Sequence, residues 1–279
     1  MKGRRFSPAR LLAISVLLLL AVLYLLPFYW MVATALKPLS AFYQFPPTLL
    51  PEGATLAPFV SVMVRRGFAG LLRNSLVVCL AGAGLGVAVA MLIVYPVTRM
   101  PVPPAFRRGL LNWILSLRFL PPIVVVIPFF DIVRQVGLYD SLFSLVMLYT
   151  VFSLSFTTWM MRSIFDGIPV EYEEAAIVDG MSRFRVLRKV IFPVAKGGIV
   201  ATAIFAMIMS WNEFVFALTL TNLKANTLPI AMPIFDQMSI VQWEVVCAAA
   251  TMIVIPMIVF AFFAQKHLIR GFTMGAVRG

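Results

Sequence analysis

Long runs of apolar residues constrain this chain more than any other feature. A helix needs about 20 consecutive, mostly apolar residues to cross a bilayer, and six stretches approach that length. They are Leu11–Ala33, Ser75–Val97, Leu110–Phe130, Ser141–Met161, Gly198–Leu220 and Val245–Gln265. The chain is 62% hydrophobic and 12% charged, whereas a soluble domain is about half apolar and about a quarter charged. We therefore expect an all-α polytopic membrane protein with six transmembrane helices.

Two of these runs are open to a second interpretation. Pro121, Pro122 and Pro128 interrupt the third run, but membrane helices tolerate proline where neighbours bond the freed carbonyl groups. We expect a single span there. The first run follows basic residues and could be a signal peptide. It is longer than the usual apolar region of about 7–15 residues, and it ends in an aromatic group, Phe28 to Trp30, that suits an interfacial belt. We expect a retained helix.

The basic residues lie at the ends of the apolar runs, and their distribution predicts the orientation. This placement explains the net charge of +12 by a membrane rather than by nucleic acid. With the N-terminus inside, the inner segments carry 16 of the 23 Lys and Arg residues and the outer segments carry 6. Because cytoplasmic loops are enriched in Lys and Arg, we expect both termini in the cytoplasm. The outer cluster of Arg65, Arg66 and Arg73 predicts a short interfacial helix before the second span.

This map divides the chain into five parts. They are a cytoplasmic tail at 1–10, a peripheral first helix at 11–33, an extracytoplasmic loop at 34–72, a core of five helices at 73–267 and a cytoplasmic tail at 268–279. The core includes a long cytoplasmic loop at 162–196. That loop differs from the rest of the chain, because it holds five of the eleven acidic residues.

The loop pattern predicts two short helices. Acidic residues at 171, 173 and 174 favour the positive end of the first helix dipole, and Gly180 suits the left-handed conformation that closes such a helix. Ser182 suits the N-cap of the second helix. In that helix Phe184, Leu187 and Ile191 form an apolar stripe, and we expect Pro193 to end it. Taken alone, the pair could be a surface loop lying along the lipid headgroups.

A specific motif narrows this choice. The residues Glu174-Ala175-Ala176, Gly180 and Val190-Ile191-Phe192-Pro193 resemble the EAA signature of bacterial ABC importer permeases. The family pattern is E-A-A, three residues, G, nine residues and I-x-L-P, and the spacing here agrees throughout. Val190 and Phe192 stand where the pattern has Ile and Leu, which are conservative departures.

Further short matches resemble the carbohydrate-uptake, maltose-permease-like branch of these permeases. They are Ala35-Leu36-Lys37-Pro38, Asn74-Ser75-Leu76, Trp211-Asn212-Glu213 and Gly271 with Gly275-Ala276-Val277-Arg278-Gly279. The resemblance therefore covers nearly the whole chain, although the loop carries most of its specificity.

The resemblance implies a type I ABC importer permease with the MetI-like fold in the bacterial inner membrane. It also implies that the loop docks on a separate ATP-binding subunit. The interface residues it assigns are Glu173, Glu174, Ala175, Ala176, Asp179, Gly180, Phe184, Arg188 and Pro193. Small residues would let the partner approach closely, and the Glu174 carboxylate would meet a partner Arg or Lys. The implied partners are a homologous second permease, two ATP-binding subunits, an extracytoplasmic binding protein and a sugar.

The chain carries no G-x-x-x-x-G-K-[ST] phosphate loop. Gly82, Gly84 and Gly86 lie inside an apolar run, where close helix packing explains them better. Cys79 and Cys247 have no metal-ligand spacing. We therefore expect that the chain is not an enzyme and binds no cofactor or metal, and that partner subunits use ATP and Mg.

Ionisable residues within spans are costly and favour a functional interpretation. Glu213, with Trp211 and Asn212, is the candidate for contact with the transported sugar, because these side chains can bond hydroxyls or stack on a sugar ring. Alternatively, Glu213 pairs with another helix and the other two only pack. The solute itself could instead be a polyol or glycerophosphodiester.

Other classes of protein are less compatible with the pattern. A secondary transporter would show inverted repeats and an embedded ion site, and a membrane enzyme would show paired carboxylates or a His/Cys cluster. Neither feature is visible in the sequence.

Overall fold

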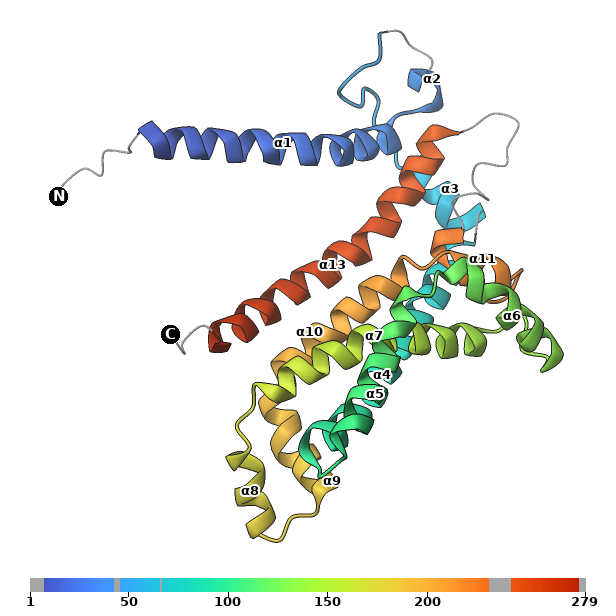
Figure 1. Cartoon of the computed structure of the whole chain (residues 1–279). Coiled ribbons are helices and arrows are strands. Elements are labelled where there is room, and N and C mark those ends of the chain that lie inside the picture. Colours follow the sequence, from blue (N-terminus) through green and yellow to red (C-terminus); the bar gives the residue numbers. More distant parts are fainter. Residues whose placement is uncertain (1–7, 43–45, 66, 231–241, 276–279) are drawn as a thin grey trace. The chain divides into compact units, whose positions relative to one another are not determined.

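A computed structural model describes residues 8–42, 46–65, 67–230 and 242–275. Most of these residues are helical, with no β-strand among them (Figure 1). The helices are α1 (Pro8–Leu36), α2 (Leu39–Phe42), α3 (Ala57–Arg65), α4 (Phe68–Arg99), α5 (Pro104–Ser116), α6 (Pro122–Gln135), α7 (Leu142–Asp166), α8 (Glu171–Val178), α9 (Arg183–Val186), α10 (Phe192–Trp211), α11 (Val215–Leu220) and α13 (Trp243–Gly275). A 3₁₀ turn, η1 (Leu117–Phe119), follows α5, and a π-helical turn, η2 (Leu187–Ile191), joins α9 to α10.

The chain forms two compact units. One comprises 1–68 with 232–254, and the other comprises 69–231 with 255–279. In the first unit, the apolar side chains of α1 are exposed along most of the helix, and only Ala33, Thr34 and Ala35 are buried in it. A helix that is apolar on all sides needs lipid or another protein around it. The short α3 is the helix that the basic cluster predicts before the second span.

Five helices in the described ranges are long and apolar enough to cross a membrane, and a bent pair makes up to six. The bent pair is the third expected span, in which α5 and η1 meet α6 at 98°. A residue before proline is driven to extended backbone, and Leu120 and Pro121 have ψ angles of 113° and 133°. The expected third span is therefore broken into two helices, and it counts as one span only if the bent pair crosses together. Pro128, by contrast, lies inside the continuous α6.

The second unit is built around α4, α7 and α10, and glycines allow two of these helices to approach closely. A Cβ atom on Gly82 would lie 3.1 Å from the Cβ of Tyr149, and one on Gly86 would overlap the Ser153 hydroxyl. The hydroxyl of Thr157 donates to the Gly86 carbonyl at 3.3 Å. Close packing is thus confirmed for Gly82 and Gly86. Among the described residues, nothing lies within 4 Å of the Cβ position of Gly84, so close packing there stays a prediction.

The loop at 162–196 forms the two helices that its pattern predicts, but the second does not end at Pro193. The helical path runs from Arg183 to Trp211 without interruption. Pro193 is the second residue of α10, directly after the π turn. Proline is tolerated in the first turn of an α-helix, because an N–H is not required there. The second loop helix is therefore continuous with the fifth span.

Candidate functional site

The loop helix α8 lies with α9 at one end of the second unit (Figure 1). Three acidic residues occupy its first turn, where the helix dipole favours negative charge. Gly180 closes the helix with a φ of +80°. The Gly180 N–H donates to the Ile177 carbonyl at 2.9 Å, and the Met181 N–H donates to the Ala176 carbonyl at 3.0 Å. This is the Schellman arrangement, and it confirms the left-handed glycine that the sequence predicts.

One face of this helix pair is open. Glu174, Ala175, Asp179, Gly180, Arg188 and Pro193 are exposed. Two large apolar side chains share the exposure, Val178 at 87% and Phe184 at 66%. Apolar side chains next to charges on an exposed surface are typical of a site for another protein. Most of the residues that the signature assigns to a partner interface are therefore accessible.

Phe184 does not follow the apolar stripe that its spacing predicts. Leu187 and Ile191 are buried, whereas Phe184 is exposed. The buried face is centred between Val186 and Leu187, and at about 100° per residue Phe184 lies to one side of it. Phe184 thereby belongs to the open face rather than to the core.

The other face of α8 packs against the rest of the chain. Glu173 is 3% exposed and Ala176 is 6% exposed. Ala176 joins a hydrophobic cluster drawn from α4, α7, α8 and the helix from α9 to α10. Small size at Ala176 therefore serves packing inside the chain, which differs from the partner contact that the signature suggests for it.

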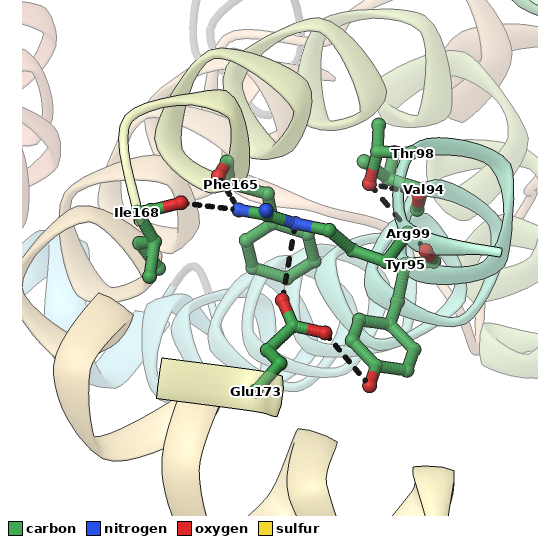
Figure 2. Close-up of polar contacts among 7 residues, drawn as sticks. All are labelled: Val94, Tyr95, Thr98, Arg99, Phe165, Ile168 and Glu173. Carbon is green, nitrogen blue, oxygen red and sulfur yellow. Dashed lines mark hydrogen bonds and ion pairs between the residues drawn. The ribbon is translucent and has the colours of Figure 1, made fainter. Parts of the chain in front are cut away.

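Glu173 makes its polar contacts within the chain as well (Figure 2). Its Oε1 atom lies 3.1 Å from Nε of Arg99, and its Oε2 atom accepts a hydrogen bond of 3.2 Å from the Tyr95 hydroxyl. Both partners belong to the C-terminal end of α4. Of the two adjacent glutamates in the signature region, Glu174 alone is exposed to a partner.

Arg99 also holds the end of α7. Its Nη2 atom donates to the Ile168 carbonyl at 2.6 Å and to the Phe165 carbonyl. A cation at this position satisfies carbonyl groups that the end of a helix leaves free and opposes the negative end of its dipole. The sequence indicates only a cytoplasmic cation at Arg99, because the residues it contacts are 66 to 74 positions away.

At the other end of the second unit, Asp140 organises the loop that follows α11. Its carboxylate accepts hydrogen bonds of 3.0–3.1 Å from the consecutive N–H groups of residues 222 to 225. Burial opposes ionisation, but these backbone donors outweigh it and lower the pKa of Asp140 to about 2. Asp140 has a φ of +57°, a conformation that Asp tolerates better than most residues.

The helix α4 holds the same loop from a second side. The Asn74 side chain donates to the carbonyls of Lys224 and Asn226, each at 2.9 Å. The Leu228 N–H donates to the Ser75 hydroxyl at 2.7 Å. The short sequence match at Asn74-Ser75 therefore lies at the point where α4 meets this loop.

The predicted solute contacts lie where the fifth span breaks between α10 and α11. Glu213 caps α11, accepting from the Phe216 N–H at 3.0 Å and from the Tyr149 hydroxyl at 2.9 Å. Trp211 is buried and meets Phe260 of α13 edge-on, with ring centroids 5.7 Å apart. Asn212 is the exposed member of the three. These consecutive residues therefore have different environments, and Glu213 has a structural role that the sequence pattern does not reveal.

Residues 82–274 match the family model described as "Binding-protein-dependent transport system inner membrane component". The chain is 34% identical over 260 residues to the trehalose transport system permease protein of Mycobacterium tuberculosis, covering 91% of this chain and 93% of that protein. It is 30% identical over 274 residues to the sulfoquinovosyl glycerol transport system permease protein of Agrobacterium fabrum, covering 98% and 94%. Its fold is similar to a crystal structure of a bacterial ABC transporter involved in the import of alginate, with a TM-score of 0.79, 22% identity and coverage of 95% and 99%.

Proposed function

The chain belongs to the family of inner membrane components of binding-protein-dependent transport systems, and on that premise we propose that it forms the path for a saccharide through the bacterial inner membrane. It is a multi-pass permease subunit of an ABC importer and is not catalytic. ATP hydrolysis belongs to partner subunits, which would hold the ATP and Mg.

The observation that carries the proposed coupling role is the division of α8 into two faces. The open face presents Glu174, Ala175 and the exposed Val178 to a partner, while Glu173 anchors the helix inside the chain. In this proposal the ATP-binding subunit docks on the open face and also contacts Asp179, Phe184 and Arg188. The glutamate at 174 supplies a carboxylate to a basic residue of that subunit.

The solute class follows from the relatives. Proteins named for trehalose and sulfoquinovosyl glycerol transport align with more than nine-tenths of this chain, so a disaccharide or another glycoside is the proposed cargo. Asn212 is the proposed solute contact, because its side chain is exposed at the break in the fifth span and an amide can both donate to and accept from hydroxyl groups. Polyols and glycerophosphodiesters are the alternative cargo.

The proposed assembly contains a homologous second permease, two ATP-binding subunits and an extracytoplasmic binding protein that delivers the sugar. Both termini and α8 lie in the cytoplasm, in agreement with the 16 to 6 distribution of Lys and Arg. Asp140 and the loop after α11 then lie on the side of the binding protein.

The proposal is tested by uptake into proteoliposomes that contain the purified complex. Binding protein loaded with trehalose or another glycoside should drive accumulation that requires ATP, and vesicles without ATP provide the control. Accumulation of a polyol or glycerophosphodiester, with no uptake of any glycoside, would overturn the saccharide assignment. Uptake that runs on an ion gradient without ATP would overturn the importer class.

A further inference from the structure

We propose that Arg99 is the positioning residue through which movement of α8 reaches α4 and α7. This inference rests on the proposed function, in which α8 docks on the ATP-binding subunit. Arg99 lies behind α8 and would act on coupling without touching that subunit. Its side chain is only 8% exposed, so a docked partner meets the open face of α8 rather than this guanidinium.

The geometry joins three elements at one side chain (Figure 2). The guanidinium belongs to the last residue of α4, its Nε atom faces Glu173 of α8 at 3.1 Å, and its Nη2 atom bonds the Phe165 and Ile168 carbonyls at the end of α7. The planar fork of arginine presents several donors in fixed directions. A shift of α8 relative to either helix must therefore stretch or break one of these contacts.

Burial makes the contact more than a surface ion pair. The Glu173 side chain is 4% exposed, and separating a buried pair leaves a charge without compensation in a medium of low polarity. The chain contains a natural comparison in Arg162 and Asp166 of α7. Nε of Arg162 lies 3.5 Å from Oδ2 of Asp166, but the two side chains are 48% and 55% exposed. Such surface pairs contribute little to stability.

The same helix reaches the opposite end of the second unit. At about 1.5 Å per residue, α4 extends roughly 38 Å from Arg99 back to Asn74 and Ser75, which lie near its other end. These two residues fix the loop at 224–228. Movement that Arg99 passes to α4 is thereby applied to the loop on the side where the binding protein delivers its solute.

The experiment compares Arg99→Gln with Arg162→Gln in the purified complex. We measure the amount of ATP-binding subunit that co-purifies, and the ratio of solute accumulated to ATP hydrolysed. Arg99→Gln should assemble normally and hydrolyse ATP, while the ratio falls by about tenfold, within the usual range of a coupling free energy. Arg162→Gln should match the native complex in both measurements.

Two milder variants keep the test decisive if Arg99→Gln does not accumulate in the membrane. Arg99→Lys retains the charge without the fork, and Tyr95→Phe removes only the hydroxyl bonded to Glu173. Each should assemble normally with a smaller fall in the ratio.

Three results overturn the proposal. An unchanged ratio in the Arg99 variants would show that the contact does not transmit movement, and loss of the ATP-binding subunit from Arg99→Lys would show that it only shapes the docking helix. An equal fall of the ratio in Arg162→Gln would show that the effect is not specific to Arg99. The native complex separates this inference from the proposed function, because failure of ATP-driven glycoside uptake by native protein contradicts the function itself.

Discussion

Glu173 and Glu174 are adjacent in the sequence but lie in opposite environments. Glu173 is 3% exposed and paired with Arg99, whereas Glu174 is exposed. Successive residues of a helix are about 100° apart around its axis, so one turn of α8 can hold both an internal anchor and an external contact. The two glutamates of the signature region therefore require different experiments.

Reversing the exposed charge should disrupt docking. Truncating one side of a buried interfacial pair commonly costs about 2–5 kcal/mol, so we expect Glu174→Lys to weaken co-purification of the ATP-binding subunit by at least tenfold. Asp166→Lys is the control, because Asp166 is an exposed acid outside α8, where a surface charge is worth about 0–1 kcal/mol. Equal assembly of Glu174→Lys and native protein in pull-down titrations would contradict the docking role.

The turn after α8 depends on backbone conformation rather than on space. Gly180 has a φ of +80°, and nothing lies within 4 Å of its Cβ position. A β-branched residue is strained at positive φ while Asn tolerates it, so Gly180→Val should lower coupled transport and Gly180→Asn should preserve most of it. Uptake normalised to protein in the membrane provides the measurement. Equal uptake by both variants would show that the left-handed turn is not required.

The Asp140 contact should stabilise the loop after α11 wherever the carboxylate is ionised. Its pKa is lowered from 3.8 to about 2, so the stabilisation is complete above the ordinary pKa and is lost as the pH falls through about 2. Asp140→Asn tolerates the positive φ but lacks the charge, and we expect faster hydrogen exchange at residues 222–225, equivalent to about 1–3 kcal/mol. A thermal stability difference from native protein that persisted unchanged at pH 2 would contradict this account.

Topology provides an independent check on orientation. Because the Lys and Arg residues divide 16 to 6, reporter fusions after Gly279 and near Gly180 should report the cytoplasm. A fusion near Gly53 should report the outside. Alkaline phosphatase and a cytoplasm-active reporter at each position give opposite signals, so cytoplasmic activity at Gly53 would overturn the map.

The sequence predicts the features that depend on local chemistry. Apolar runs locate the spans, the motif locates α8, and Gly180 adopts the conformation that its position indicates. Contacts between residues far apart in the chain cannot be predicted from the sequence in this way. Nothing local shows that Arg99 meets Glu173 or that Glu213 caps α11 beside Tyr149, because these partners are brought together by packing.

Proline shows why local rules also fail in context. Consecutive prolines at 121 and 122 bend the third span by 98°, while Pro193 lies in a continuous helix. The difference is position: Pro121 and Pro122 restrict the residues before them in mid-span, whereas Pro193 occupies the first turn after a π-helical segment.

The most direct test of the central claim is a cysteine cross-link from the open face of α8 to the ATP-binding subunit. Ala175→Cys places a thiol on that face, and Arg108→Cys places one at an exposed position of α5. Cys79 is buried, and Cys247→Ser removes the other native thiol. With a short thiol cross-linker, the account predicts an adduct containing both subunits from Ala175→Cys and none from Arg108→Cys. An adduct from Arg108→Cys with none from Ala175→Cys, in a complex that transports normally, would contradict it.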